Sequence, residues 1–269
     1  MLLDLVYETE YHYAPAVPHG VSALRLRPRA DARQRVRTAE LHVDPGAVRT
    51  TFRDGWGTLV DLVGIATSHD RAAYRLHAVV ETGAGAAEEP LGPDARYLFR
   101  QPTGRTPLAS ARRLLPEIGL AGGAWADVEA VIAWIAAQFE HQPGETDVDS
   151  PLPVLIETRR GVCQDFAHLA LAVLRAWGWP ARYVSGYAFT GDQGGLVMEA
   201  EAMHAWVDVY LPGHGWLGLD PTSGGAISER YVVVGSARDY DDLAPVRGVL
   251  RGETKQAHRS RLRLEHSEQ

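Results

Sequence analysis

The sequence predicts an α+β protein in which an all-β, sandwich-like domain precedes a domain of helices packed on an antiparallel sheet. Three observations predict this class. The first hundred residues alternate between apolar and polar side chains, which is the period of half-buried strands. From Thr106 the apolar residues recur at helical spacing, and after Pro180 the strand pattern returns. A chain of 269 residues is long enough for two domains of ordinary size.

The first domain is predicted to span residues 1–105 and to consist of short strands separated by turns. In the first strand Leu5 and Tyr7 share one face while Asp4 and Glu8 share the other, so this strand is expected to be buried on one side. Several such strands without helices between them are typical of a sandwich. The predicted strands are residues 3–13, 22–28, 35–43, 58–65 and 74–81.

The second domain is predicted to span residues 106–248 and to begin with helices. A stretch rich in glycine and alanine at residues 82–93 is interpreted as the connection that leads to it. The dipeptides Thr106-Pro107 and Ser150-Pro151 each join an N-cap residue to a proline suited to the first helical position. The predicted helices are residues 107–116, 125–139, 151–159 and 163–177.

The single cysteine, Cys163, lies where the last of these helices begins, just after Gly161. A thiol in the first turn of a helix faces unpaired backbone N–H groups and the positive end of the helix dipole, which favours the reactive thiolate. The junction of two helices at a glycine is expected to expose this sulfur. A lone cysteine is otherwise a small buried apolar residue. A catalytic interpretation therefore needs a base and an orienting group elsewhere in the chain.

A predicted hairpin offers both groups. Alternation along its first strand places His204 and Trp206 on one face. A three-residue loop pairs Trp206 with Asp220, which leaves His204 as a same-face diagonal neighbour of Asp220, about 7–8 Å away at Cα. A two-residue loop would put the two side chains on opposite faces. The predicted strands are residues 181–189, 201–211 and 216–220, and a flexible, glycine-rich loop is predicted at residues 190–195.

A thiol at a helix start, an imidazole on a strand and a carboxylate on the paired strand form an arrangement suited to nucleophilic acyl transfer. His204 would hold the Cys163 thiolate as an ion pair and protonate the leaving amine, and Asp220 would orient the ring. The backbone N–H of Cys163 is a candidate oxyanion donor, and the sequence places no second donor. The alternative is a structural His–Asp pair beside a buried thiol.

Neither a metal site nor a cofactor is expected. His168 follows Cys163 by five residues and lies on a different face of the helix, and one thiol with one poorly placed imidazole makes a poor zinc site. His168 is interpreted instead as a structural partner of Asp165 or of nearby backbone. No segment has the ligand spacing of an EF-hand loop.

Four blocks of sequence carry a family resemblance. They are residues 161–169 (GVCQDFAHL), 181–187 (ARYVSGY), 204–207 (HAWV) and 218–222 (GLDPT). Together they resemble the bacterial transglutaminase-like superfamily. In that family the Cys of the first block, the His of His-Ala-Trp and the Asp of Asp-Pro-Thr form the catalytic triad on a papain-like core. The resemblance therefore implies these roles for Cys163, His204 and Asp220.

The resemblance covers nearly the whole chain. The N-terminal strands look like the β-domain that precedes this core in many bacterial members, and residues 237–248 resemble a tail segment of the same subgroup. Met203 stands where the family more often has serine, and His141 stands where it more often has tyrosine. The calcium dependence of animal transglutaminases is not implied. Residues 249–269 alternate in part and are expected to form a C-terminal strand that returns to the β-domain.

The formal net charge of −7 disfavours a nucleic-acid-binding surface. Six arginines within residues 25–37 are the local exception, and their near-alternation is interpreted as the solvated face of strands. The N-terminal Met1-Leu2-Leu3-Asp4 lacks the basic region of a signal peptide, and no stretch approaches the ~20 apolar residues of a membrane span. We therefore expect a cytoplasmic protein that acts on a protein or peptide substrate, without nucleic-acid or membrane partners.

The expected function is thiol-dependent acyl transfer on an amide or peptide bond. Release of the acyl group by water would make the protein a protease, peptidase or deamidase, and release by an amine would make it a transglutaminase. The triad is common to all of these reactions, so they stay open. The alternative is a catalytically silent binding or scaffold protein with the same fold, and the intact triad residues count against it.

Overall fold

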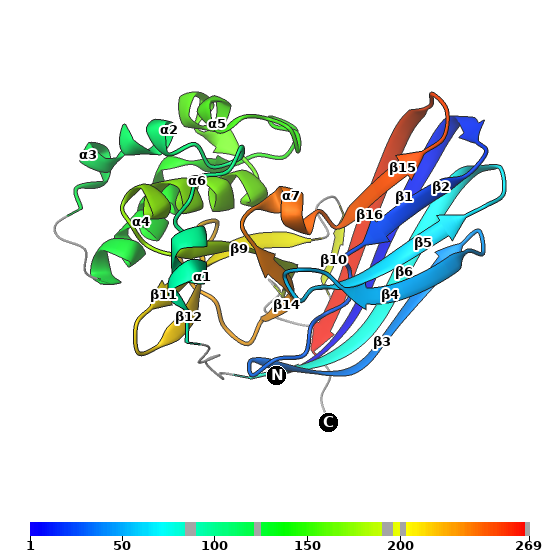
Figure 1. Ribbon diagram of the computed structural model, residues 1–269, viewed down its shortest axis with the longest axis horizontal. Helices are drawn as coiled ribbons and strands as arrows, with labels where there is room; N and C mark the ends of the chain where they lie inside the picture. The colour runs from blue at the N-terminus through cyan, green and yellow to red at the C-terminus, as the bar shows by residue number, and fades with distance from the viewer. Residues whose placement is uncertain (84–89, 121–124, 190–195, 200–202, 267–269) are drawn as a thin grey trace.

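A computed structural model describes residues 1–83, 90–120, 125–189, 196–199 and 203–266 of the chain. A β-sandwich lies beside a sheet that is covered by helices (Figure 1). This arrangement confirms the predicted α+β class. Within the described ranges, no helix is long and apolar enough to cross a membrane. The loop predicted at residues 190–195 lies outside the described residues.

The β-sandwich consists of two antiparallel sheets. Its strands are β1 (Leu2–Val17), β2 (Gly20–Leu24), β3 (Gln34–Asp44), β4 (Val48–Arg53), β5 (Leu59–Ile65), β6 (His69–Thr82), β10 (Leu196–Glu199), β15 (Val246–Leu250) and β16 (Lys255–His266). One sheet has the order β10-β16-β1-β6-β3, and the other has the order β15-β2-β5-β4. Inner-face side chains such as Leu5, Leu24 and Val63 are buried, because alternation gives these strands one apolar side.

Strand β4 is missing from the sequence prediction for a physical reason. All of its residues are exposed, and a strand without a buried side shows no apolar–polar alternation. It forms a sheet edge by pairing with β5, from Val48 opposite Gly64 to Arg53 opposite Leu59.

The last strand of the chain completes the sheet that the first strand begins. β16 runs antiparallel to β1, from His266 opposite Leu3 to Lys255 opposite Ala14, and the two strands lie side by side in Figure 1. On its other side β16 pairs with β10. Because β10 belongs to the second half of the chain, segments from both halves share one sheet.

The second part is a sheet covered by helices. Its strands are β9 (Ala181–Ala188), β11 (His204–Leu211), β12 (Gly215–Asp220), β13 (Gly225–Ala226) and β14 (Tyr231–Ala237), in the order β13-β12-β11-β9-β14. The helices are α1 (Pro93–Leu98), α2 (Leu108–Arg112), α3 (Leu115–Ile118), α4 (Trp125–Gln138), α5 (Leu152–Thr158), α6 (Cys163–Ala176) and α7 (Tyr240–Leu243). Two short parallel strands, β7 (Glu140–His141) and β8 (Arg160–Gly161), precede α6. Helix α6 is central, since it packs against α2, α4, α5, β9 and β11.

Two helices start one residue later than predicted. Pro107 and Pro151 are the N-cap residues of α2 and α5, and neither helix has a side-chain cap. The Thr106 hydroxyl instead accepts a hydrogen bond from the Thr103 N–H (3.1 Å), and the Ser150 hydroxyl bonds to the preceding loop. Helix α1 was not predicted, because it begins inside the stretch interpreted as a connection.

The apolar core of the sandwich includes side chains from the sheet that the helices cover. Tyr187 of β9, together with Val232 and Val234 of β14, packs among the buried side chains of the sandwich. The predicted boundaries at residues 105 and 248 stay predictions, since packing continues across the junction. This continuity fixes where the sandwich lies relative to α6 and β11.

Candidate active site

Cys163 is the first residue of α6, and the residues around it fix its position. The backbone N–H of Val162, the N-cap residue, donates to Asp165 Oδ2 (2.9 Å), and the Thr146 hydroxyl donates to the same oxygen (2.6 Å). A Cβ at residue 161 would lie 2.7 Å from that oxygen, so a side chain there would displace the carboxylate. The carboxylate in the first turn thus satisfies a backbone donor that a helix start leaves unpaired.

The thiol of Cys163 is not exposed as expected, since the residue is only 7% accessible. The expectation considered only the two helices that meet at Gly161, whereas the Thr146–Val148 loop and the sandwich also close around the junction. The sulfur nevertheless borders a cavity of about 430 Å³. The lining residues are Tyr7, Thr146, Asp147, Val148, Val162, Cys163, Gln164, Tyr183, Ser185, Met203, His204, Ala205, Tyr240, Pro245, His258 and Ser260.

The hairpin of β11 and β12 brings His204 to Asp220. Leu211 lies opposite Gly215 and Val207 lies opposite Leu219, which confirms the predicted three-residue loop. His204 Nε2 lies 2.9 Å from Asp220 Oδ2.

The imidazole of His204 also hydrogen-bonds the Cys163 side chain. The structure therefore brings Cys163, His204 and Asp220 together, with the imidazole between the thiol and the carboxylate.

The charges of this group support one another. Burial disfavours the charged form of His204, but the Cys163 thiolate and the hydrogen-bonded Asp220 carboxylate outweigh it and raise the pKa of the imidazole to about 10. Burial also disfavours the charged form of Asp220. There the hydrogen bond and positive charge of His204, with further donors, hold the pKa of the carboxyl below its usual range. Near neutral pH the imidazole is therefore a cation that can stabilise a thiolate.

Three further groups support the imidazole and the carboxylate, and the sequence analysis named none of them for this role. The Tyr231 hydroxyl donates to Asp220 Oδ2 (2.8 Å), and the Thr222 N–H donates to Asp220 Oδ1 (2.8 Å). The Trp206 ring stacks on His204, with centroids 6.1 Å apart and an interplanar angle of 30°. These contacts fix the orientation of the ring and of the carboxylate.

A glycine makes room for these aromatic rings. Gly186 of β9 lies opposite both His204 and Val233, so it separates β11 from β14. A Cβ there would lie 2.0 Å from the Val232 carbonyl oxygen and 2.7 Å from Trp206 Cη2. Glycine inside a predicted strand is the sequence signal for such a close approach.

His168 has the structural role expected of it. Its partner is a backbone N–H group and not the Asp165 side chain. His168 is buried, its Nε2 accepts a hydrogen bond from the Tyr240 N–H (3.3 Å), and its ring stacks on Tyr183. Asp165 bonds to other groups. Burial, with the positive charges of Arg105 and Arg175, lowers the pKa of His168 to about 3, so this imidazole stays neutral.

The prediction that the arginines of residues 25–37 form the solvated face of strands is wrong for Arg25, Arg27, Arg29 and Arg33, which lie largely buried in the loop between β2 and β3 because each is paired with a carboxylate. The arginine pairs are Arg25 with Asp54, Arg27 with Asp61, Arg29 with Asp31, Arg33 with Asp208 and Arg37 with Glu81.

Among the described residues, no group of three or more His, Cys, Asp or Glu side chains is arranged to hold a metal ion.

Two family models match the chain. The model described as the transglutaminase-like superfamily matches residues 115–221, a range that contains Cys163, His204 and Asp220. The model described as the bacterial transglutaminase-like N-terminal region matches residues 3–81, which form most of the sandwich.

The chain is similar over nearly its full length to two uncharacterized mycobacterial proteins. One, from Mycobacterium leprae, is 32% identical in an alignment of 269 positions that covers 93% of each chain. The other, from Mycobacterium tuberculosis H37Rv, is 31% identical over 277 residues, covering 91% of this chain and 86% of the relative.

Two further similarities cover the core and the fold. A protein-glutamine gamma-glutamyltransferase of Pseudomonas aeruginosa is 37% identical in an alignment of 115 positions that covers 37% of this chain and 16% of that protein. A provisionally assigned cysteine protease of Cytophaga hutchinsonii has a solved structure with a TM-score of 0.80. It covers 100% of this chain and 92% of its own length at 21% identity, which shows the fold alone.

Proposed function

The chain belongs to the transglutaminase-like superfamily, and we propose that it catalyses thiol-dependent acyl transfer on an amide bond, with Cys163 as nucleophile, His204 as base and acid, and Asp220 as the orienting carboxylate. The observation that carries the proposal is the position of His204. Its ring bonds to Asp220 through Nε2 and to the thiol of Cys163 on its other side. A thiol, a base and an orienting group in this order are the parts that nucleophilic catalysis requires.

The proposed reaction begins with attack of the Cys163 thiolate on the amide carbonyl carbon. The C–S bond forms and the carbonyl oxygen becomes an oxyanion. The backbone N–H of Cys163, at the start of α6, is a donor for this charge. The imidazolium of His204 then gives its proton to the amide nitrogen, the C–N bond breaks, and the amine leaves a thioester on Cys163.

Release of the acyl group completes the cycle. The now neutral His204 takes a proton from an incoming water or amine, which attacks the thioester carbonyl, and the thiolate leaves. Water yields a carboxylic acid, as in a protease or deamidase, and an amine yields a new amide, as in a transglutaminase. A scaffold protein without turnover would need neither the buried ion pair nor the cavity beside the sulfur.

Alkylation by iodoacetamide tests the ion pair without knowledge of the substrate. We expect the wild-type protein to react stoichiometrically at neutral pH, and His204→Ala to react at least about a hundredfold more slowly. His214→Ala is the matched control, because His214 is exposed in the hairpin loop, away from the thiol. Wild-type reactivity no greater than that of a free cysteine would contradict the proposal.

A second experiment separates the reaction types. Wild type and Cys163→Ala are incubated with a peptide library and biotin-labelled cadaverine, and the products are identified by mass spectrometry. Thiol-dependent conversion of a carboxamide to a carboxylic acid, or thiol-dependent peptide cleavage, indicates hydrolysis, and thiol-dependent biotin incorporation indicates amine transfer. The absence of both, with normal thiol alkylation, would favour the scaffold alternative.

A further inference from the structure

The cavity beside Cys163 has one wall that the helical part does not provide. Tyr7 of β1 and both His258 and Ser260 of β16 line it, together with Cys163 and His204. Resting on the proposed function, we propose that this wall, which we call the sandwich wall (Tyr7, His258 and Ser260), binds the segment of substrate that Cys163 attacks. We further propose that the wall selects an uncharged, polar segment.

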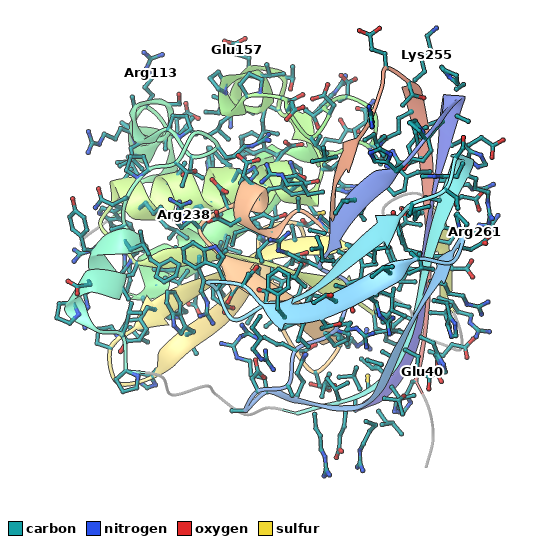
Figure 2. The ribbon with its side chains drawn as sticks, turned by 45° about the vertical axis from the view of Figure 1, so that its right-hand side comes forward. Glu40, Arg113, Glu157, Arg238, Lys255 and Arg261 are labelled. Carbon is teal, nitrogen blue, oxygen red and sulfur yellow. The ribbon has the colours of Figure 1, made fainter. Side chains whose placement is uncertain are left out.

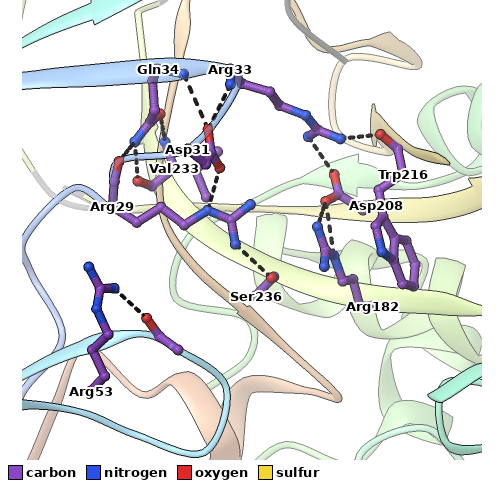
Figure 3. A network of polar contacts seen from close by, with 11 residues as sticks. Arg29, Asp31, Arg33, Gln34, Arg53, Arg182, Asp208, Trp216, Val233 and Ser236 are labelled. Carbon is purple, nitrogen blue, oxygen red and sulfur yellow. Dashed lines mark hydrogen bonds and ion pairs between the residues drawn. The ribbon is translucent and has the colours of Figure 1, made fainter. Parts of the chain in front are cut away.

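Buried contacts hold the sandwich, which carries the wall, against the sheet that carries His204 and Asp220. Arg33, from the loop before β3, donates to Asp208 of β11 (3.2 Å), which also accepts from Arg182 of β9 (2.9 Å) (Figure 3). The side chain of Gln34 donates to the Val233 carbonyl oxygen (2.7 Å) and accepts from the Val233 N–H (2.7 Å). The position of the sandwich wall relative to Cys163 and His204 is therefore fixed.

The groups on the sandwich wall are hydroxyls and an imidazole. The Tyr7 hydroxyl donates to Ser260 Oγ (3.4 Å), which donates to Thr9 Oγ1 (2.9 Å). His258 is exposed, and its ring stacks on Tyr11 at 5.7 Å and 23°. Such groups donate and accept hydrogen bonds without adding a fixed charge, so they suit a carboxamide or a peptide group.

The charged residues of the same strands lie on the opposite face of the sheet. Arg259 and Arg261 of β16 line a different hollow together with Glu8 and Glu10 of β1. Figure 2 shows Arg261 on the side of the sheet that faces away from the helices. Because successive residues of a strand point to opposite faces, the alternation in β16 directs its arginines away from the cavity and leaves a hydroxyl and an imidazole toward it.

The opposite side of the cavity adds little charge. Among its described lining residues there is no lysine or arginine, and Asp147 is the single carboxylate. Asp147 Oδ1 already accepts from the Asp149 N–H (2.9 Å) and from the Ser150 hydroxyl (3.1 Å). A charged segment bound at the sandwich wall would lose hydration, and the wall itself offers no counter-ion, which is unfavourable. A neutral segment loses less and can bond to the wall.

Alkylating reagents that differ only in the charge of a short tail test this inference. They are the N-chloroacetyl derivatives of β-alaninamide (neutral), β-alanine (anionic) and 1,3-diaminopropane (cationic). In each case the thiolate of Cys163 forms a C–S bond and chloride leaves. Each rate constant, measured at low ionic strength, is divided by the iodoacetamide rate constant of the same variant, so that changes in thiol reactivity cancel.

The test compares wild type with His258→Asp, His258→Lys and His12→Asp. His12 is the matched control. It is an exposed histidine of the same sheet, and it lines the hollow on the opposite face, together with Arg259 and Arg261. We expect the neutral reagent to be fastest in wild type. His258→Asp should raise the cationic-to-anionic rate ratio by about tenfold or more, and His258→Lys should lower it by a similar factor. His12→Asp should leave the ratio unchanged.

The outcomes separate the two proposals. Slow alkylation of wild type by iodoacetamide would contradict the proposed function itself. Rapid alkylation, with equal rates for the three tails or with a ratio that does not respond to the charge at residue 258, would overturn the sandwich wall while leaving the triad intact. If His12→Asp changed the rate ratio as much as His258→Asp, the proposal of the sandwich wall would also be overturned. The change in the ratio would then be caused by the net charge of the protein and not by the charge at residue 258. Melting temperatures of all variants verify that they are folded.

Discussion

His204 is a half-buried imidazole whose pKa is raised because the Cys163 side chain and the Asp220 carboxylate flank it. Burial alone would make it neutral, as it does for His168, whose pKa falls to about 3. The Cys163 thiolate and Asp220 reverse this preference and raise the pKa of His204 to about 10. The pKa values of these two histidines are therefore shifted in opposite directions, and the difference lies in their neighbours.

The raised pKa of His204 makes a prediction about pH. Its folded-state pKa of about 10 lies above the ~6.5 of an unfolded chain, so the stabilisation is complete below about pH 6.5 and is lost as the pH rises through about 10. In Asp220→Asn the pKa of His204 should fall, because burial is then opposed by the thiolate alone. NMR titration of the His204 ring measures both values.

Denaturant unfolding at two pH values provides the second readout of this prediction. The loss of stability in Asp220→Asn should be larger at pH 6 than at pH 10.5. The control is Asp4→Asn, which removes the carboxylate of an exposed pair with His77 and should leave the titration of His204 unchanged. A His204 ring that titrates near 6.5 in the wild-type protein would contradict the ion pair.

Helix α6 is the element that positions the sulfur. Its first turn depends on Asp165, which accepts from the Val162 N–H and from the Thr146 hydroxyl. Asp165→Ala should lower the free energy of unfolding by about 1–2 kcal/mol, as for the loss of other helix caps, and should slow alkylation of Cys163. Urea unfolding and the iodoacetamide rate measure the two effects.

The conservative variant Asp165→Asn separates the cap from the charge. Asparagine keeps an acceptor oxygen at the same position, so its loss of stability and of thiol reactivity should be smaller than that of alanine. Equal effects of the two variants would indicate that the charge of Asp165, and not its hydrogen bonds, supports the start of α6.

The accuracy of the element predictions follows the strength of the local pattern. Helix α4 and the hairpin of β11 and β12 are close to their predictions, because their apolar spacing and loop length are specific. Strand β4 was missed because it has no buried face. The N-caps of α2 and α5 were misplaced by one residue, since Thr106 and Ser150 bond to loops instead of to the helix.

At the scale of the whole molecule, buried ion pairs join the sandwich to the sheet of β9, β11 and β12. Asp208 is completely buried between Arg33 and Arg182, and burial of its carboxylate is offset by these cations, which hold its pKa below the usual range. Arg182 also lies over the Trp216 ring, 4.2 Å from its centroid. Arg33 is the member of this network that comes from the sandwich.

Removal of Arg33 should therefore destabilise the whole molecule. Arg33→Met leaves a buried carboxylate with one partner fewer, and the expected loss of unfolding free energy is about 3–5 kcal/mol. Arg37→Met is the matched control, since Arg37 and Glu81 form a half-exposed pair that is expected to contribute at most about 1 kcal/mol. Urea unfolding followed by tryptophan fluorescence and by far-UV circular dichroism measures the difference. Equal losses in the two variants would contradict a buried link between the two parts.

The sequence by itself determined the fold class, the start of a helix at Cys163 and the register that brings His204 to Asp220. These features depend on periodicity and on the length of one loop, and both act within a few residues of the chain. The same local reasoning wrongly predicted an exposed thiol at Cys163, because it considered only the two helices next to Gly161.

Only the tertiary structure decided the surroundings of the candidate site. Tyr231 reaches Asp220 past Gly186 from a strand that does not pair with β11. Tyr7 and Ser260 meet from positions 253 residues apart and line the cavity of Cys163. Such contacts depend on how separate sheets pack against each other, and the alternation within a strand specifies only which face is buried and not what covers it.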